Sequence, residues 1–435
     1  MAIRWRAILS ALLAAGFVLG TTRPVRADLD PATRRKVFDA VWTKVRDTHW
    51  DPTYGGVDWN KIRTRYAPKV AAVKSDGAFY QLIQTMLGEL GQSHFHIIPP
   101  EAYVASDTTG GVRDGDGATG MTIGLVDGRA VVMAVDSDSA AAEAGVAPGW
   151  TVVAVGNTKV DPLLAKIKAR KLKPAAERVE VRTLAMGLLA GQRGDTVRVS
   201  FEGREPVALV RRAPKGVASR MGNLPPMPAF VETKALAGGI GYIRINIFLV
   251  EPVMQQVREA VESFADAPAL VFDLRGNPGG VGGMASGIAG MLVASGRDKY
   301  SLGSMKMRKG EIRFAVNPQP PFFTKPVAVL IDEMSLSTSE LFAGGLQEMN
   351  RVVVVGRRTG GMVLPSNIEK LPGGVRFQYA VADFKTPKGV LLEGRGVIPD
   401  IAVELTRTQL LRGGDPTLDA ALGALQRKIG ARAKS

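Results

Sequence analysis

Short apolar runs rich in β-branched residues recur through the second half of the chain, separated by stretches with helical periodicity. The runs lie at residues 241–247, 270–274, 327–331 and 352–355. Continuous apolar runs of this kind are typical of strands that are buried on both faces. The segments 251–264 and 283–294 have apolar positions at helical spacing. Strands that alternate with helices in this way predict an α/β sheet for residues 216–408.

The chain before this region has two different patterns. Residues 28–104 carry apolar positions at helical spacing, such as Val37, Val41 and Val45, and predict an N-terminal helical domain. Residues 105–215 begin with a glycine- and aspartate-rich connector and then alternate strands with a short alanine-rich helix, which predicts a mainly-β domain. Within it, residues 160–189 are basic in their first half and are interpreted as a solvated helical insertion.

The two ends of the chain are also distinctive. Arg4 and Arg6 precede an apolar segment at residues 7–20, and Val25-Arg26-Ala27 fits a small-x-Ala cleavage site. This pattern predicts a signal peptide over residues 1–27, with an uncleaved anchor as the alternative, and hence a periplasmic or secreted protein. Residues 409–435 predict a last amphipathic helix and a basic tail.

Composition and charge narrow the classes of function. With 435 residues, 46% of them hydrophobic and 22% charged, the chain is expected to fold into two or three domains. The net charge of +15 falls to +11 without the four arginines of residues 1–27. Lysine and arginine are spread out, not clustered with aromatic residues, which argues against nucleic-acid binding. A basic surface could still associate peripherally with an anionic envelope.

Cysteine is absent and histidine occurs only at positions 49, 94 and 96. The absence of cysteine excludes thiol catalysis and cysteine-ligated metal. The histidines lack the paired spacing of a metal site beyond His94-Phe95-His96. We therefore expect neither a metal ion nor a cofactor.

Candidate chemistry follows two of the predicted strands. Ser337 and Thr338 lie between the strand at 327–331 and a helix that opens at Glu340. A serine at such a sharp turn can hold its hydroxyl near free N–H groups, although serine is also an ordinary N-cap residue. After the strand at 270–274, Asn277-Pro278-Gly279-Gly280 lets the backbone approach a ligand and donate to an oxyanion, or forms a plain turn.

These stretches together resemble the C-terminal processing, or tail-specific, serine protease family, which includes the tricorn core protease and retinoid-binding relatives. The motifs occur in the family's order, and the resemblance covers roughly residues 30–425. They are VFDLRGNPGG, SLSTSELFAGGLQE, VVGRRTGG and GRGVIPDI. The resemblance implies an α/β crotonase/ClpP-like protease core, an N-terminal helical cap and an inserted PDZ domain.

The implied PDZ domain corresponds to residues 105–215. Trp150 occupies the position of the aspartate in the Pro-Gly-Asp turn that is usual in PDZ domains. By the resemblance, an extended peptide would add as a further strand to one edge of this domain. The residues of that edge are Met121, Thr122, Ile123, Gly124 and Leu125.

The resemblance also implies the catalytic residues. Ser337, three residues before Glu340, takes the place of the family's nucleophile. The tail-specific branch activates its serine with a lysine, but Met362 occupies that position here. The tricorn-like branch uses histidine and glutamate, and His94 and Glu393 occupy those positions.

A Ser337–His94–Glu393 triad is therefore implied, with His96 as the competing base. The implied oxyanion hole is the N–H of Thr338 with that of either Gly279 or Gly280. A histidine base would make hydrolysis appear as the pH rises through about 6 to 7, whereas a rise near pH 9 would indicate lysine.

The leading interpretation is thus an exported serine endopeptidase that cleaves polypeptides and engages unstructured or C-terminal tails through its PDZ domain. The first alternative is a catalytically inactive peptide- or ligand-binding protein, suggested by the missing lysine. The second is an envelope scaffold that acts through the PDZ domain alone. The sequence leaves the substrate and the oligomeric state open.

Overall fold

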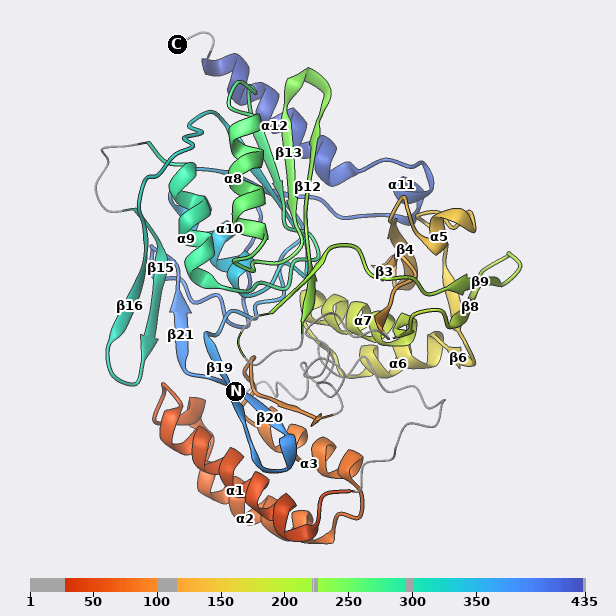
Figure 1. Cartoon of the computed structure of the whole chain (residues 1–435), viewed down its shortest axis with the longest axis vertical. Coiled ribbons are helices and arrows are strands. Elements are labelled where there is room, and N and C mark those ends of the chain that lie inside the picture. Colours follow the sequence, from red (N-terminus) through yellow and green to blue (C-terminus); the bar gives the residue numbers. More distant parts are fainter. Residues whose placement is uncertain (1–27, 101–115, 221, 223–225, 295–299, 433–435) are drawn as a thin grey trace.

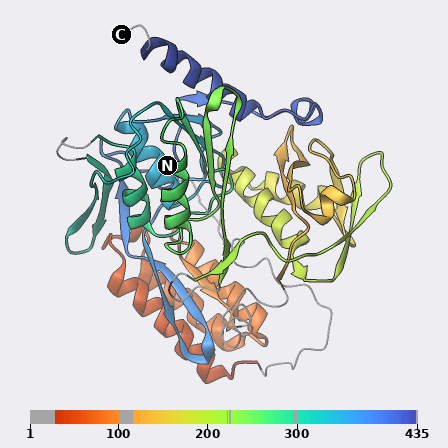
Figure 2. The same ribbon diagram turned by 45° about the horizontal axis from the view of Figure 1, so that its top comes forward.

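The computed structural model describes residues 28–100, 116–220, 222, 226–294 and 300–432. It has three lobes: helices α1 to α3 at the bottom, a mainly-β lobe on the right and an α/β core at the upper left (Figures 1 and 2). The expected signal peptide, most of the connector and the last residues of the tail lie outside the described residues. No helix in the described ranges combines the length and apolarity needed to cross a membrane.

The core is built on a six-stranded sheet in the order β12-β13-β14-β17-β18-β22. The strands from β13 to β22 are parallel, with Phe272 opposite Ile243 and Val329, and β12 is antiparallel to β13. The predicted α/β sheet is therefore present, with strand ends within two residues of those expected. The strands span Val231–Ala235, Gly241–Ile245, Leu270–Asp273, Val327–Ile331, Val353–Gly356 and Ile401–Ala402.

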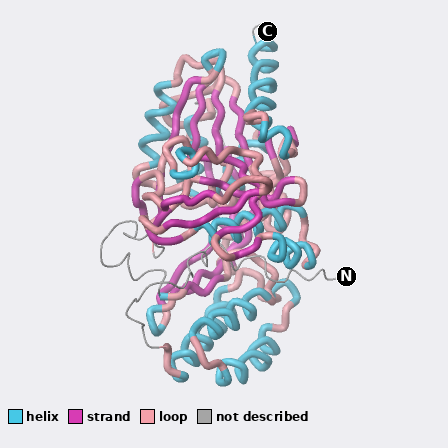
Figure 3. Tube along the Cα trace, turned by 90° about the vertical axis from the view of Figure 1, so that its right-hand side faces the viewer, coloured by secondary structure: helices cyan, strands magenta, loops and turns pink. Residues whose placement is uncertain are grey.

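Helices cover both faces of this sheet, as Figure 3 shows from the side. Phe272 and Val329 point to one face, while Val271 and Leu330 point to the other. Because successive side chains of a strand alternate between faces, two covered faces require an apolar residue at nearly every position. The first face is covered by α8 (Val253–Ser263), α9 (Gly282–Met291) and α10 (Thr338–Glu348), and the second by α12 (Pro416–Arg432).

A partly buried ion-pair network joins the end of β14 to the start of α12. Arg275 donates to Asp273 at 3.0 Å and, through both terminal nitrogens, to Asp415 at 2.8 Å. Asp273 is almost fully buried and also accepts from the Tyr242 hydroxyl at 2.7 Å. Asp415 in turn accepts from the Leu418 N–H in the first turn of α12 at 3.0 Å. The arginine thus fixes α12 against the sheet.

A second sheet lies beside the core. It has the antiparallel order β16-β15-β21, and α9 and α10 pack against it. The strands are β15 (Tyr300–Met307), β16 (Glu311–Val316) and β21 (Ala382–Lys385).

The N-terminal helical lobe has a core that is completed by a hairpin from far along the chain. Phe38 and Phe79 of the helices pack with Phe377 and Tyr379 of that hairpin, which lies on the helices in Figure 2. The helices are α1 (Pro31–Thr48), α2 (Trp59–Ala72) and α3 (Asp76–Gly88), and the sheet β1-β20-β19 comprises His96–Ile98, Arg376–Ala380 and Ser366–Lys370. The expected helices are present, and residues outside 28–104 contribute to their core.

The mainly-β lobe contains a four-stranded sheet, β6-β5-β8-β9, and a separate pair of strands, β3 and β4. The expected edge residues 121–125 lie in β3, which pairs with β4 on one side and has α7 packed against it. The strands are β3 (Met121–Val126), β4 (Arg129–Val135), β5 (Val152–Val155), β6 (Thr158–Lys159), β8 (Thr196–Phe201) and β9 (Val207–Val210). Three helices accompany them: α5 (Ala140–Glu143), α6 (Asp161–Ala169) and α7 (Pro174–Leu189).

The segment expected to be a solvated insertion is only partly so. Helix α6 has no buried residue, but α7 is buried along much of its length. Val179 of α7 packs with Leu336 and Met362, and Arg182 donates to Asp332 at 2.7 Å. The expectation was wrong for α7, because Val179 is covered by core residues more than 150 positions away, and Ala185 and Leu189 pack in the core of the mainly-β lobe.

Arg275→Met is expected to lower the free energy of urea unfolding by about 3 kcal/mol, because it leaves the Asp273 carboxylate buried without its cation. The matched control is Lys61→Met, which removes an exposed helical ion pair with Asp58 and should cost below about 0.5 kcal/mol. Equal losses from the two substitutions would contradict a structural role for the Arg275 pair.

Candidate active site

Ser337 lies at the turn between β17 and α10. It is half-buried and has a φ of 54°, a conformation that costs a non-glycine residue energy. Its N–H donates to the Met362 carbonyl at 2.9 Å and lies 3.1 Å from the Glu340 carboxylate. Strained residues of this kind cluster at active sites, and here the surrounding hydrogen bonds hold the strain in place.

The glycine loop after β14 lies directly against this serine. A Cβ atom on Gly279 would lie 2.7 Å from Ser337 Cβ and 2.8 Å from the Leu336 carbonyl oxygen. Asn277 locks the two segments together. Its side chain donates to the Ile245 carbonyl at 2.8 Å, and its own carbonyl accepts from the Leu336 N–H at 3.0 Å. The close approach therefore requires glycine at position 279.

The two expected glycine donors are not equivalent. The Gly279 N–H already donates to Asn277 Oδ1 at 2.9 Å. The Gly280 N–H and the Thr338 N–H have no hydrogen-bond acceptor among the described residues. Their two segments are joined by a bond of 2.7 Å from the Thr338 hydroxyl to the Gly280 carbonyl. Two free donors therefore lie beside Ser337.

His94 is joined to Glu393 through a residue that the sequence interpretation did not include. Ser93 Oγ lies 2.7 Å from His94 Nδ1 and donates to Glu393 Oε2 at 2.9 Å. The Ser93 N–H donates to Glu393 Oε1 at 2.7 Å. His94 has a φ of 62°, so both the candidate base and the candidate nucleophile are in strained conformations. The only sequence signal for Ser93 was its place inside the Leu-Gly-Gln-Ser-His stretch.

His96 has a different environment. It begins β1, where it is buried and paired with Gln378 of β20. His94 precedes the strand in a left-handed conformation, so the two histidines do not share a strand face as expected for a continuous strand. Of these two histidines, only His94 is hydrogen-bonded to Ser93 and, through Ser93, to Glu393.

The third histidine supports the loop that carries His94. His49 is fully buried and stacked on Trp50, with ring centroids 4.2 Å apart, and on Phe95. Its Nε2 lies 2.8 Å from the amide oxygen of Gln92, the residue before Ser93. The helical lobe thus holds one end of the loop.

Met362, at the lysine position of the tail-specific branch, is buried against Val179 and Leu336. Its N–H donates to Glu340 at 2.8 Å, and the next N–H, of Val363, donates to Glu393 at 3.0 Å. A buried carboxyl group, that of Glu340, and a partly buried one, that of Glu393, therefore accept from consecutive N–H groups. Among the described residues, no three His, Asp or Glu side chains are grouped as metal ligands.

The exclusion of water from this region shifts the pKa values of one histidine and two glutamates. It lowers the pKa of His94 to about 4, and it raises the pKa of Glu393 and of Glu340 to about 7. The imidazole is then neutral well below the expected range of pH 6 to 7. The carboxyl groups of Glu393 and Glu340 therefore have pKa values nearer to that range than the His94 imidazole has.

Two models of known protein families match parts of this chain. Residues 239–403 match the model of peptidase family S41, and residues 30–88 match that of the tricorn protease C1 domain. The chain belongs to the C-terminal processing protease family. It is accordingly a serine-type peptidase, and the family expected from the motifs is confirmed.

Individual relatives are distant but cover most of the chain. A carboxyl-terminal-processing protease of Synechocystis sp. is 24% identical over 428 residues, which cover 97% of this chain and 93% of the relative. Tricorn protease homolog 1 of Streptomyces coelicolor is 26% identical over 92% of this chain, which spans 36% of that protein. The solved photosystem II D1 C-terminal processing protease shares the fold, with a TM-score of 0.57 at 23% identity over 86% of this chain and 93% of its own.

Gly279→Ala is expected to lower peptidase activity at least about 100-fold, because the new methyl group would push Ser337 and the Thr338 N–H out of position. Gly389→Ala is the matched control, since Gly389 also has positive φ but has open space around its Cβ position. Comparable activity in the two variants would contradict the close-approach requirement.

The pH profile of kcat/KM is expected to rise near pH 7, because Glu393 must lose its proton to accept strongly from Ser93 and to stabilise an imidazolium at His94. Glu393→Gln should remove that limb and lower kcat/KM by roughly 10³-fold at pH 8. Glu404→Gln, at an exposed acid, serves as the control. A limb that persists near pH 7 in Glu393→Gln would exclude this carboxyl as its source.

Proposed function

We propose that this peptidase cleaves polypeptides through an acyl-enzyme formed on Ser337, with His94 as the base. The observation that carries the proposal is the continuous chain from His94 Nδ1 through Ser93 Oγ to Glu393. With Nδ1–H held by Ser93, the other ring nitrogen, Nε2, is the basic one. The catalytic set is then Ser337, His94, Ser93 and Glu393, in which Ser93 transmits the orienting effect of the carboxylate.

In the acylation step, His94 Nε2 takes the proton of Ser337 Oγ as the oxygen attacks the substrate carbonyl carbon. The developing oxyanion accepts from the N–H groups of Thr338 and Gly280. Gly280 is preferred to Gly279 as the second donor because the Gly279 N–H already donates to Asn277. The imidazolium then gives its proton to the leaving amine, and the C–N bond breaks. Water deprotonated by His94 attacks the ester and releases the second product.

We further propose that the mainly-β lobe is the PDZ domain of this protein and that it engages unstructured or C-terminal tails. Two observations support this role. In the described residues, β3 pairs with a strand on one side only. Helix α7, packed beside β3, contacts Leu336 next to the nucleophile through Val179. A tail added along β3 would therefore be held close to Ser337. We place this activity in the periplasm or outside the cell, as the pattern of residues 1–27 indicates.

Labelling with a fluorophosphonate probe tests the mechanism. The wild-type protein is expected to be modified at Ser337, as mapped by mass spectrometry, and Ser337→Ala should abolish the signal. His94→Ala should slow labelling at least about 10³-fold, and Ser93→Ala should slow it less, because it removes an orienting contact and leaves the base. His96→Ala is the control and should label at a rate near that of the wild type.

Slower labelling in His96→Ala than in His94→Ala would reassign the base. Modification at another residue, or no modification of the wild-type protein, would contradict catalysis by Ser337.

A further inference from the structure

A run of exposed basic side chains occupies the end of α6 and the turn that leads into α7. The basic strip, as we call it, consists of Lys166, Lys168, Arg170, Lys171 and Lys173, and no acidic residue interrupts it. The dipole of α6 favours cations in the last turn of that helix, but Lys171 and Lys173 lie beyond the helix. Like charges four positions apart, such as Lys166 and Arg170, repel each other. A ligand of opposite charge would relieve this repulsion.

The acidic residues nearby in sequence do not neutralise the strip. Residues 161–180 contain six basic residues against three acidic ones, which gives a net charge of +3. One of these acids, the buried Glu180 of α7, accepts a hydrogen bond from Arg170. Arg178, the sixth basic residue, forms an ion pair with Glu404 at 3.2 Å. The surface over the end of α6 therefore keeps an excess of positive charge.

The basic strip ends beside the loop that carries Glu393. Helices α6 and α7 pack against each other (Figure 1), and Lys173, just before α7, donates to the Gly394 carbonyl at 3.0 Å. Arg358 Nε donates to the carbonyl of the exposed Arg395 at 2.5 Å. Cations from three separate parts of the chain are thus gathered next to a residue of the proposed catalytic set.

The chemistry of the strip favours an acidic polypeptide over a nucleic acid or a lipid surface. Residues 161–180 contain no aromatic side chain on which a base could stack. Peripheral helices bind bilayers by inserting an apolar face. In α6, every residue of which is described, Leu163, Leu164 and Ile167 are all partly covered, and Leu164 packs on the core of the mainly-β lobe.

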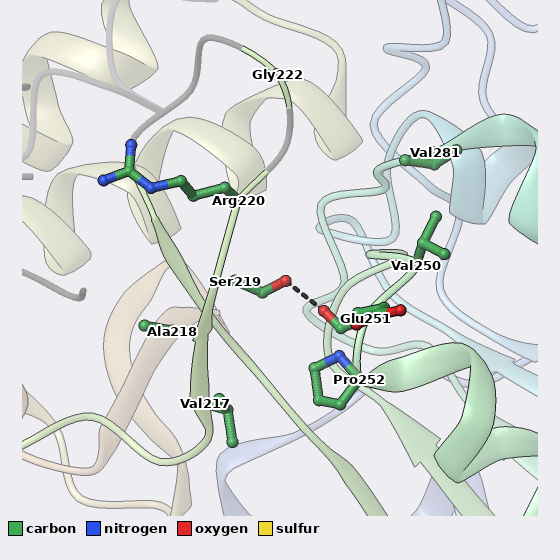
Figure 4. Close-up of a pocket in the computed structure, with 9 residues that line it drawn as sticks. All are labelled: Val217, Ala218, Ser219, Arg220, Gly222, Val250, Glu251, Pro252 and Val281. Atoms are coloured by element: carbon green, nitrogen blue, oxygen red, sulfur yellow. Dashed lines mark hydrogen bonds between the residues drawn. The ribbon is translucent and has the colours of Figure 1, made fainter. Parts of the chain in front are cut away.

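A pocket elsewhere on the molecule is less suited to an acidic ligand. It has a volume of about 610 Å³ and lies between β10 (Val217–Ser219) and the turn after β13 (Figure 4). Its lining includes the exposed Arg220 and the exposed Glu251, which have opposite charges. These two charges give an acidic ligand no net attraction, whereas the side chains of the basic strip are all positive.

We propose that the basic strip binds an acidic segment of a polypeptide substrate and holds that chain beside the Glu393 loop. The attraction is between exposed charges, so it raises the local concentration of acidic chains and weakens as salt screens it. The effect of the strip on cleavage rests on the proposed function, whereas the binding of an acidic segment does not.

The test measures binding of two fluorescein-labelled, unstructured peptides by fluorescence anisotropy. One peptide carries a run of aspartates, and the other carries asparagines at the same positions. The Ser337→Ala protein, which leaves the peptides intact, is expected to bind the aspartate peptide at least about tenfold more tightly at about 50 mM NaCl. Adding Lys166→Gln, Lys168→Gln and Lys171→Gln should abolish this preference, as should about 0.5 M NaCl.

The matched control combines Lys36→Gln, Lys74→Gln and Lys309→Gln in the Ser337→Ala protein. These lysines are also exposed, but they lie on the helical lobe and on the turn between β15 and β16. The control removes the same net charge and should keep the preference for the aspartate peptide. With Ser337 present, the substitutions in the strip should raise KM for cleavage of the aspartate peptide at least about tenfold, because its binding is weakened.

Each other outcome has a distinct meaning. Equal affinity for the two peptides, or a preference that survives the substitutions in the strip, would overturn the strip as a site for acidic segments. Strip-dependent binding to phosphatidylglycerol vesicles without any peptide preference would overturn it in favour of a lipid surface. A strip-dependent peptide preference, in a wild-type protein that neither reacts with fluorophosphonate nor cuts either peptide, would support the strip and overturn the proposed function.

Discussion

The site depends on one close contact, in which the backbone of Gly279 lies against Ser337 without room for a side chain. Asn277 maintains this contact. Its side chain is bound to the Ile245 carbonyl and the Gly279 N–H, and its carbonyl accepts from both the Leu336 N–H and the Ser339 hydroxyl. Three adjacent strand ends are thereby joined at one buried amide. The strained conformation of Ser337 persists because the backbone on both sides of it is held by this amide and by Glu340.

Two carboxyl groups accept hydrogen bonds from the backbone at Met362, where the family resemblance places a lysine, and at Val363. Glu340 and Glu393 are each surrounded by hydrogen-bond donors, so the region is already rich in buried acid. Met362 packs on α7 with its apolar side chain, in a cluster with Val179 and Leu336. Burial lowers the pKa of His94, which favours the neutral imidazole that the proposed base requires.

All three lobes contribute to this one region. The helical lobe holds the His94 loop through His49 and Gln92, the α/β core supplies Ser337 and the glycine loop, and α7 of the mainly-β lobe covers Met362. A polypeptide that reached Ser337 would therefore lie near segments from several parts of the chain. A substitution in one lobe could then alter the geometry around Ser337.

The sequence by itself determined the α/β core, since the apolar runs that become β13, β14, β17 and β18 reflect local periodicity. It also pointed to Ser337, His94 and Glu393, because each lies in a short motif. Only the tertiary structure decided how these residues connect. Ser93 and Glu393 are 300 positions apart, so no local pattern could reveal that Ser93 lies between His94 and the Glu393 carboxyl group.

The same reason applies to the other differences. The Gly279 N–H is occupied because the side-chain oxygen of Asn277 accepts a hydrogen bond from it. Helix α7 is buried in part because Leu336 and Met362 pack against its Val179. The pKa of His94 and of Glu393 depends on how much water the folded chain excludes. Sequence patterns report local conformation and the identity of candidate groups, whereas hydrogen-bond partners and solvation are set by residues that only folding brings together.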